Sequence, residues 1–368
     1  MRGAFNIFRL FGIPVRVHWS FFLLFTWVGY VGFSAGMSWP HILWLGLFMI
    51  ALFACVVLHE FGHALTARYY GIRTYDITLL PIGGVARLAH MPEKPTEELL
   101  VAIAGPAVNV VLGFGLWMWL SWQREYWVAQ AAASLIHPSG ALFLYEANFL
   151  PALAFTNLFV AAFNMLPAFP LDGGRVVRAL LSFRWSRLTA TRIAAYLGQG
   201  IAMGLLVLAL VQFDLILGLI SVFIFTTASR EYAYVKDWEV LRKVPVSKLM
   251  RRRFTLLRQT DPAGLVLHLM AQTGESNFLI ADAKGWPQQV LSEKALLRHL
   301  QTQPQMRAAP IGSLAQVIPH VLQPDQPLSQ ALKLMEQHHL PLLPVISREH
   351  LQGVLDWEKA KVLGHLLH

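Results

Sequence analysis

Two histidines and a glutamate lie within five consecutive residues, His59-Glu60-Phe61-Gly62-His63, inside a long apolar stretch. In a helix, four residues turn through about 400°, so the rings of His59 and His63 point to nearly the same side. Two such imidazoles can share one tetrahedral zinc ion, and Glu60 lies close enough to act as a general base toward water. The simpler alternative is three groups that are merely solvated at the end of a membrane helix. Because uncompensated charge is costly there, we favour a metal site.

A catalytic zinc usually takes three protein ligands, and the best third candidate is Asp172. It lies in the segment NMLPAFPLDGGR (164–175), where prolines and glycines interrupt a helix. An interrupted helix at membrane depth is tolerated when it lines a cavity, which favours Asp172 as a ligand. The alternative is that Asp172 caps a following helix over 175–184. A cysteine cluster is excluded, because Cys55 is the single cysteine of the chain.

Two neighbours of the histidine motif have structural interpretations. Cys55 lies one turn before His59 on the same face, and we expect it to pack against neighbouring side chains rather than to line a cavity. A single cysteine also allows no intrachain disulfide. Gly62 either allows another helix to approach closely or is an ordinary small residue of a membrane interface.

The composition indicates that these residues belong to a polytopic membrane protein. Hydrophobic residues make up 55% of the 368 residues and charged residues 14%, whereas soluble domains have about 25% charged residues. The mean hydropathy is +0.49. A membrane span needs about 20 apolar residues, and six segments come close to that length. They are approximately residues 17–36, 41–67, 97–121, 149–168, 193–212 and 214–230.

Positive charges determine the predicted orientation. Arginines and lysines precede the first span and follow the second, fourth and sixth, whereas Arg124 is the only positively charged residue in the opposite loops. This asymmetry places both termini in the cytoplasm. Contact with anionic lipid accounts for the net charge of +9, and we expect no nucleic-acid binding because no basic run is interleaved with aromatic residues. We expect no cleavable signal peptide, so the first apolar stretch remains as a transmembrane helix.

Two stretches between the spans have patterns of their own. Residues 75–90 alternate on either side of Pro81-Ile82-Gly83-Gly84, which predicts a β-hairpin or re-entrant loop. The loop 121–148 is amphipathic in part (WVAQAAASLI) and predicts a short surface helix.

Beyond about residue 245 the apolar runs shorten, and two segments match at a spacing of about 64 residues. Residues 246–249 match 311–314, and residues 260–262 match 324–327. Each half reads as strand, helix, strand, strand, helix, which indicates a tandem soluble module on the cytoplasmic side. The predicted divisions are a membrane domain with the candidate metal site (1–235), a linker (236–244), a first repeat (245–303) and a second repeat (304–368).

HEFGH on one membrane helix, followed by NMLPAFPLDGGR on a later one, resembles the site-2 protease family of intramembrane metalloproteases. Residues 105–109 (GPAVN) look like the family's GPxxN element, and the 75–90 hairpin looks like its re-entrant segment. The resemblance covers about residues 1–235. It implies one zinc ion per chain, held by His59, His63 and Asp172, with Glu60 as general base. It also implies four residues that help to position substrate or to structure the site: Asn109, Asn164, Gly83 and Gly84.

The family's substrates are transmembrane segments of other proteins, which are cleaved within or beside the bilayer. We therefore expect a transmembrane protein or peptide as substrate and membrane lipid as the surroundings. A helical substrate must unwind, and the edge of the 75–90 hairpin can hold it as an added strand. The expected location is the inner membrane of a prokaryotic cell.

The C-terminal repeat resembles a pair of CBS domains, which one branch of the family carries. This implies a regulatory module or a homodimer formed through these domains. CBS pairs often bind adenine nucleotides through an element ending in Ser/Thr-x-x-Asp. The corresponding stretches here, 289–295 and 353–359, do not end in Asp, so we do not expect adenine nucleotide binding in the usual mode.

The predicted fold is a polytopic α-helical membrane protein, with six transmembrane helices and a re-entrant β-hairpin, followed by an α/β tandem CBS-like domain. The predicted function is intramembrane zinc proteolysis. A transporter or channel gated by CBS domains is the first alternative, but the halves contain no inverted repeat of broken helices. An inactive relative is the second, and the intact HExxH motif with Asp172 argues against it.

Overall fold

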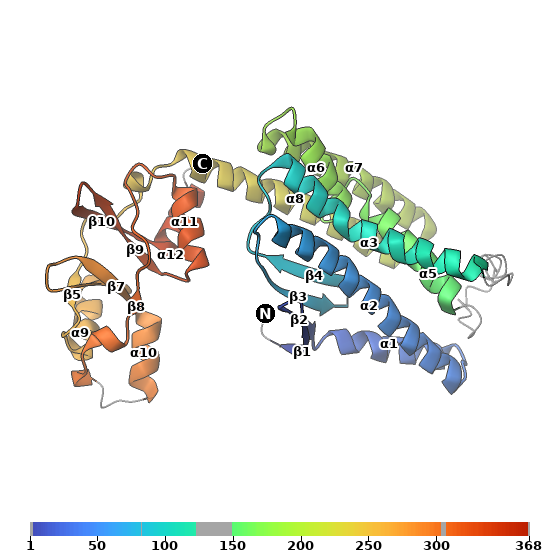
Figure 1. Cartoon of the computed structure of the whole chain (residues 1–368), viewed down its shortest axis with the longest axis horizontal. Helices are drawn as coiled ribbons and strands as arrows, with labels where there is room; N and C mark the ends of the chain where they lie inside the picture. Colours follow the sequence, from blue (N-terminus) through green and yellow to red (C-terminus); the bar gives the residue numbers. More distant parts are fainter. Residues whose placement is uncertain (1–2, 82, 123–148, 303–306, 367–368) are drawn as a thin grey trace. The chain divides into compact units, whose positions relative to one another are not determined.

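The computed structural model describes residues 3–81, 83–122, 149–302 and 307–366. The chain divides into two compact units, Met1–Ala233 and Tyr234–His368 (Figure 1). The first unit combines a small sheet with apolar helices, and the second is an α/β unit. The surface helix predicted within 121–148 lies outside the described residues, apart from the last two residues of a preceding helix.

Long apolar helices make up most of the first unit. Within the described ranges, four helices are long and apolar enough to cross a membrane: α2 (Trp39–Tyr69), α3 (Pro95–Trp122), α7 (Arg187–Gln212) and α8 (Leu215–Lys243). Two of the predicted spans are shorter helices, α1 (Phe21–Ser34) with 14 residues and α5 (Phe149–Asn164) with 16. At 1.5 Å per residue these extend about 21 and 24 Å, less than a hydrocarbon core of about 30 Å. The six predicted spans are therefore four long helices and two short ones.

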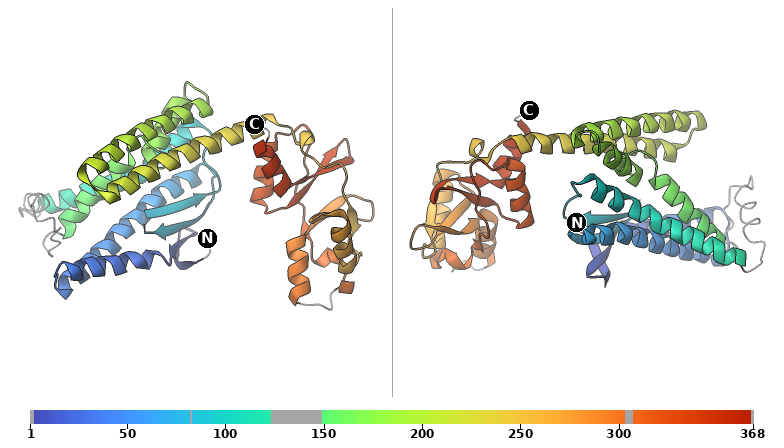
Figure 2. Two further views of the ribbon diagram at one scale, coloured as in Figure 1. Left: turned by 180° about the vertical axis from the view of Figure 1, so that it is seen from behind. Right: turned by 45° about the horizontal axis from the view of Figure 1, so that its top comes forward.

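A four-stranded sheet in the order β1–β2–β3–β4 accompanies these helices (Figure 2). Its strands are β1 (Ala4–Leu10), β2 (Ile13–His18), β3 (Thr74–Leu80) and β4 (Gly83–Leu88). The predicted hairpin is confirmed, because β3 pairs antiparallel with β4 and Leu80 lies opposite Gly83. The start predicted for the first span is wrong, because β2 continues to His18 and α1 begins at Phe21.

The short strand β2 is specified by strict alternation. Ile13, Val15 and Val17 are buried, and the residues between them are half-buried. The buried side chains belong to a cluster with Phe53 and Phe61 of α2, so the sheet lies against this helix. Because the alternation runs directly into an apolar helix, a window of about 20 residues merges the two elements.

Asp76 ties three of the four strands together. Its buried carboxylate accepts hydrogen bonds from Nε (2.6 Å) and Nη2 of Arg87 on β4, and it pairs with Nη1 of Arg16 on β2 at 3.1 Å. Burial alone would raise the pKa of Asp76, but the hydrogen bonds and charge of Arg87 and the charge of Arg16 hold it below its usual range. The ion pairs therefore tie both β4 and β2 to β3.

Helix breaks determine where the later helices begin. The fourth predicted span ends early, because α5 ends at Asn164 and turns lead to α6 (Asp172–Ser182). Ser186 caps α7 by accepting a hydrogen bond from the backbone N–H of Thr189 at 3.2 Å. The last helix, α8, continues to Lys243, so the stretch 236–244 predicted as a linker is helical almost throughout.

The second unit contains two halves with the same order of elements. Each half has a short 3₁₀ turn, then a strand, a helix, two strands and a helix, as predicted. The first half contains β5 (Leu256–Arg258), α9 (Ala263–Thr273), β6 (Asn277–Ala281), β7 (Pro287–Ser292) and α10 (Glu293–Thr302). The second half contains β8 (Gln316–Val317), α11 (Leu328–Gln337), β9 (Leu342–Ser347), β10 (His350–Asp356) and α12 (Trp357–Leu366).

Backbone bridges relate the two halves of this unit. Pro245 bridges to Pro327, and Pro262 bridges to Pro310. Since Pro245 precedes the first 3₁₀ turn as Pro310 precedes the second, the two bridges are reciprocal. The repeat in the sequence thus corresponds to a repeat in the fold.

Candidate metal centre

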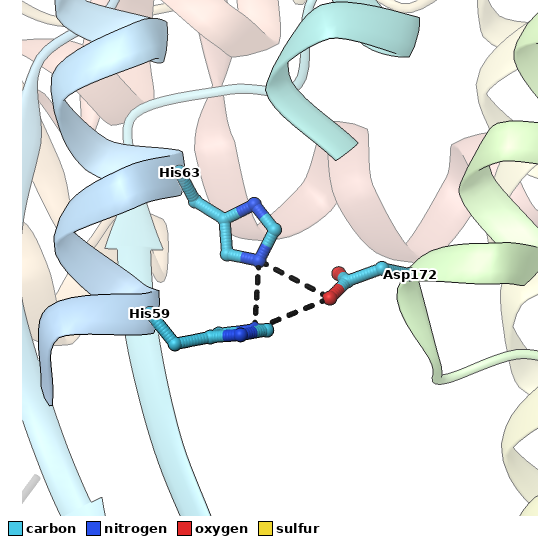
Figure 3. Close-up of side chains that lie close together, drawn as sticks. All are labelled: His59, His63 and Asp172. Carbon is cyan, nitrogen blue, oxygen red and sulfur yellow. Dashed lines mark hydrogen bonds and ion pairs between the residues drawn. The ribbon is translucent and has the colours of Figure 1, made fainter. Parts of the chain in front are cut away.

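Three buried side chains that can bind a metal meet between α2 and α6 (Figure 3). His59 and His63 extend from α2, and Asp172 is the first residue of α6. The Nε2 atoms of the two histidines are 3.1 Å apart, and Oδ2 of Asp172 lies 3.3 Å from His59 Nε2 and 3.2 Å from His63 Nε2. Among the residues that the structure describes, no other group of three or more such side chains converges in this way.

Hydrogen bonds on the far side of each ring determine where its proton lies. His59 Nδ1 contacts Oδ1 of Asn109, and His63 Nδ1 lies 2.7 Å from the carbonyl oxygen of Val101. Both partners are acceptors, so each Nδ1 carries the proton and donates it. In the neutral rings each Nε2 atom then has a free lone pair directed toward the carboxylate of Asp172.

This arrangement of lone pairs fits a zinc ion. Three lone-pair atoms at such short distances repel one another unless a metal ion or a proton lies among them. Tetrahedral zinc ligands, at about 2.0–2.1 Å from the ion, are about 3.3–3.4 Å apart, close to the separations seen here. Two histidines and one carboxylate are also a donor set of catalytic zinc sites, which keep a fourth position for water or substrate.

The glycines of two helices make room for the histidine rings. A Cβ atom at Gly105 of α3 would lie 2.2 Å from His63 Nε2 and 2.7 Å from His59 Nε2. A Cβ atom at Gly62 would lie 2.6 Å from the carbonyl oxygen of Ala104. The predicted close approach at Gly62 is confirmed, and α3 forms the wall behind both rings.

A chain of amide hydrogen bonds orients His59. Asn109 on α3 donates through Nδ2 to Oδ1 of Asn157 on α5 at 2.8 Å, and Asn157 Nδ2 donates to the carbonyl oxygen of Leu153 at 2.8 Å. These donations leave Oδ1 of Asn109 to accept from His59, as a buried histidine ligand requires. Asn157 was not among the residues predicted from the sequence. Its amide within the apolar stretch PALAFTNLFVAAF could have indicated a functional residue, because polar groups are costly inside a membrane helix.

Asp172 takes its position from the turn that precedes α6. The N-cap of α6 is Leu171, and Asp172 itself is the first helical residue, with its side chain on the histidines. The capping alternative is therefore not what the structure shows, and α6 starts three residues earlier than predicted. A Cβ atom at Gly173 would lie 2.2 Å from the carbonyl oxygen of Leu166, so this glycine lets the turn fold back against the helix.

Glu60 faces the free edge of the sheet. The backbone N–H of Ala86 on β4 donates to Glu60 Oε2 at 2.9 Å. A Cβ atom at Gly84 would lie 2.7 Å from Cγ of Glu60, so glycine is required where β4 passes this side chain. The carboxylate is thus held beside both the histidines of α2 and the outer edge of β4.

The other residues singled out from the sequence lie near the site in different roles. Cys55 is buried with Phe48 and Leu153 in an apolar cluster, which confirms the packing interpretation. Asn164 ends α5 and lies outside the amide chain of Asn109 and Asn157. Gly83 has a φ of +136° at the start of β4, a conformation that favours glycine.

Comparisons with known proteins match two parts of the chain to known families. The model of peptidase family M50 matches residues 47–209, and the CBS domain model matches residues 311–359. The zinc metalloprotease MJ0392 of Methanocaldococcus jannaschii is 34% identical over 250 residues, which are 68% of this chain and 67% of that protein. The Mycobacterium tuberculosis protein Rip3 is 32% identical over 272 residues, which are 68% of this chain and 64% of that protein. The chain thus spans about two thirds of the length of these relatives.

Among solved structures, the site-2 protease of Methanocaldococcus jannaschii is 33% identical and has a TM-score of 0.44, with 62% of this chain and 95% of that chain covered. The family match includes His59, His63 and Asp172 within its limits. The chain therefore belongs to peptidase family M50, the site-2 protease family of zinc metalloproteases, and carries a CBS domain toward its C-terminal end.

Proposed function

We propose that this protein is an intramembrane endopeptidase that cleaves peptide bonds within or next to transmembrane segments of other membrane proteins, in regulated intramembrane proteolysis. The observation that carries the proposal is the convergence of three lone-pair atoms of His59, His63 and Asp172 at 3.1–3.3 Å. The carboxylate of Glu60 extends from the same helix one residue after His59.

In this proposal one zinc ion per chain is held by His59, His63 and Asp172. When bound, zinc would polarise the scissile carbonyl and lower the pKa of a water molecule. Glu60 accepts the proton of the attacking water and later donates it to the leaving amine. The amide of Ala86 keeps the Glu60 carboxylate from rotating away, so the base does not have to be ordered during the reaction.

We propose that the substrate binds as an extended strand along β4. This strand is the outer edge of the sheet, and residues two apart along it present their N–H and C=O groups to the same side. Because the N–H of Ala86 points away from β3 toward Glu60, the N–H and C=O of Gly84 point the same way. A strand added here would pass directly in front of Glu60. A helical substrate must unwind before it can pair in this way.

The four residues predicted to position substrate or to structure the site fall into three groups. Gly84 presents its N–H and C=O to the free edge of β4, where they would contact an added strand, and Gly83 lies at the turn that begins this strand. Asn109 is engaged with His59, so its contribution is to the metal site rather than to substrate. Asn164 remains a candidate for substrate contact at the end of α5.

The membrane arrangement supports access from the cytoplasm. We propose that α1 and α5 cross the bilayer together with the four long helices, which gives six spans with both termini on the cytoplasmic side of a prokaryotic inner membrane. The HExxH motif lies in the C-terminal half of α2, and Arg68 follows it in the last turn of this helix. By the positive-inside rule this end faces the cytoplasm, so water would reach the site from that side.

We propose domain limits of 1–235 for the membrane protease and of 245–303 and 304–368 for the two CBS-like repeats, which regulate or dimerise the enzyme. In the stretch 353–359, which corresponds to the nucleotide-binding element of CBS pairs, Asp356 has a structural role. It accepts a hydrogen bond from the N–H of Lys359 at 3.2 Å and caps α12. Lys359 stands where a nucleotide-binding element would have its aspartate. Adenine nucleotide is therefore not proposed as a ligand in the usual mode.

The test is the Glu60→Gln variant of the full chain, purified in detergent and supplied with zinc and a transmembrane substrate. We expect zinc content to stay at one ion per chain and cleavage to fall by at least about 100-fold, since general-base catalysis contributes about that much or more. Glu239→Gln is the matched control, because Glu239 lies near the cytoplasmic end of α8 and pairs only with Arg242 among the described residues. Cleavage by Glu60→Gln at the parent's rate would refute the mechanism.

A further inference from the structure

Arg178 is buried in the first unit, six residues after Asp172 on the short helix α6. Its side chain is 1% exposed. The guanidinium contacts Glu98 of α3 through Nε (2.7 Å) and Nη2 (2.6 Å), and Glu231 of α8 through Nη1 (2.5 Å). It also lies over the ring of Phe169, 5.0 Å from the ring centroid. One buried arginine thus joins three helices, with a buried partner on α3 and a partly exposed partner on α8.

Glu98, one of the two acidic partners, lies on the same helix that contacts both histidines of the metal site. Glu98 is 2% exposed and lies in the first turn of α3. On the same helix, Val101 accepts the hydrogen bond from His63, Gly105 makes room for both rings, and Asn109 accepts from His59. Spacings of three, four and four residues put all four positions on one face of α3. That face therefore contacts both histidines directly and the helix of Asp172 through Arg178.

The turn before α6 places Asp172 at the start of the helix, and a second anchor further along α6 determines how the helix is rotated. The residues between α5 and α6 are turns and bends, so no continuous helix leads into Asp172. The helix α6 has only 11 residues, and six residues correspond to a distance of about 9 Å along its axis. A rotation or slide of α6 by a fraction of a turn would remove the carboxylate from the histidines.

An ion pair is also an unexpected way to hold a helix if stability alone is required. Burying charge is costly, and well-packed apolar side chains often stabilise a protein as well or better. The guanidinium, however, is planar and rigid, so its hydrogen bonds from Nε to Glu98 and from Nη1 to Glu231 define its direction as well as its depth.

We propose that Arg178 is a positioning residue for the metal site: through Glu98 and Glu231 it sets the rotation of α6 that brings Asp172 to the two histidines. The inference rests on the proposed zinc site. Arg178 itself touches neither metal nor substrate.

The experiment measures zinc affinity in the purified full chain, by competition with a chromophoric chelator. The variants are Arg178→Met, Arg178→Lys, Glu98→Gln and Glu231→Gln. The control is Gln199→Leu, which removes a 2.8 Å hydrogen bond between α7 and Ser229 of α8, neither of whose partners belongs to α6. Cobalt is bound in place of zinc in parallel samples, because its visible absorption reports the number of ligands. Unfolding temperature is recorded for every variant.

We expect Arg178→Met and Glu98→Gln to weaken zinc binding by about 10- to 100-fold, the usual effect of removing a group that orients a metal ligand. The Glu231→Gln variant should have a smaller effect, because Glu231 is 33% exposed and water can replace it. Arg178→Lys should recover part of the loss, and Gln199→Leu should bind like the parent. The cobalt spectrum of Arg178→Met should change as expected for the loss of one carboxylate ligand.

The outcomes separate this inference from the proposed function. If the parent chain binds no zinc, the zinc site itself is wrong. If the parent binds zinc and Arg178→Met binds it equally well while unfolding at a lower temperature, Arg178 is only structural and the inference is refuted. If Arg178→Met does not fold, the near-isosteric Glu98→Gln variant decides in the same way.

Discussion

Replacing Gly105 by alanine should remove the metal site while leaving the helices in place. The added Cβ atom would lie 2.2 Å from Nε2 of His63 and 2.7 Å from Nε2 of His59. Ordinary contact begins at about 3.4 Å, so the His63 ring would have to move by about 1 Å. Metal–ligand distances tolerate only about 0.2 Å, and a shift of this size therefore removes His63 from the ligand set.

The expected loss of zinc affinity is more than about 100-fold, which corresponds to about 2.8 kcal/mol. This is larger than the 10- to 100-fold effect of losing a group that only orients a ligand. The assay is chelator competition on the purified full chain, with cleavage of a transmembrane substrate measured on the same samples. The matched control is Gly115→Ala on the same helix, where an added Cβ has no atom within 4 Å.

Alanine favours helix over glycine by about 1 kcal/mol, so both variants should fold at least as well as the parent in their helical propensity. A Gly105→Ala protein that binds zinc with the parent's affinity would refute the arrangement of α3 behind the histidines. Loss of zinc binding in both variants would show that the effect comes from α3 in general rather than from the space at Gly105.

Three further predictions concern the surroundings of the site. Gly84→Ala should lower kcat by about 10- to 100-fold while zinc stays bound, because the new Cβ would lie 2.7 Å from Cγ of Glu60; parallel zinc and rate measurements check this. Asn157→Leu should weaken zinc binding by about 10-fold, because it frees the amide of Asn109 to turn, and an unchanged affinity would show that Asn109 needs no second amide. Asp76 has a pKa below its usual range, since its two arginine partners outweigh the opposing effect of burial, so its contribution to stability is present above about pH 4 and is lost as the pH falls through the folded-state pKa. Acid unfolding curves of Asp76→Asn should lack this part of the pH dependence, and identical curves for variant and parent would contradict the assignment.

The ligand set could be predicted from the sequence because its chemistry is local. His59 and His63 are one helical turn apart, so their convergence follows from helix geometry alone. Asp172 could be placed with them because the charge pattern puts the ends of the second and fourth apolar stretches at the same face of the membrane. In each case a short segment and one topological rule were sufficient.

The groups that support the ligands could not be predicted in this way. Asn157, Glu98 and Arg178 lie on three different helices, and which faces of those helices meet depends on packing that hydropathy does not encode. A buried ion pair such as that of Glu98 and Arg178 also looks like two ordinary helix-end charges in a sequence. In the structure both side chains are almost fully buried.

Of the four-stranded sheet, the β3–β4 hairpin was predicted from the sequence and the strand β2 was not. The β3–β4 hairpin has a turn sequence and alternating residues, and it is flanked by polar residues that separate it from the spans. The strand β2 alternates as clearly, but it runs into α1 after a gap of two residues, Trp19 and Ser20. The first span was therefore predicted too long, and α1 is a 14-residue helix behind a strand.

The face of α3 explains why a site made from distant segments can be built reproducibly. His59 and His63 come from one helix and Asp172 from another, more than 100 residues later. If each ligand were oriented by an unrelated neighbour, small shifts of three elements would add, and the distances among the ligand atoms would vary. Because α3 contacts both histidines and, through Glu98, the helix of Asp172, a shift of α3 moves the partners of all three ligands together. The positions of all three ligands thus depend on one helix, α3, whose glycines and polar residues lie at the points of contact.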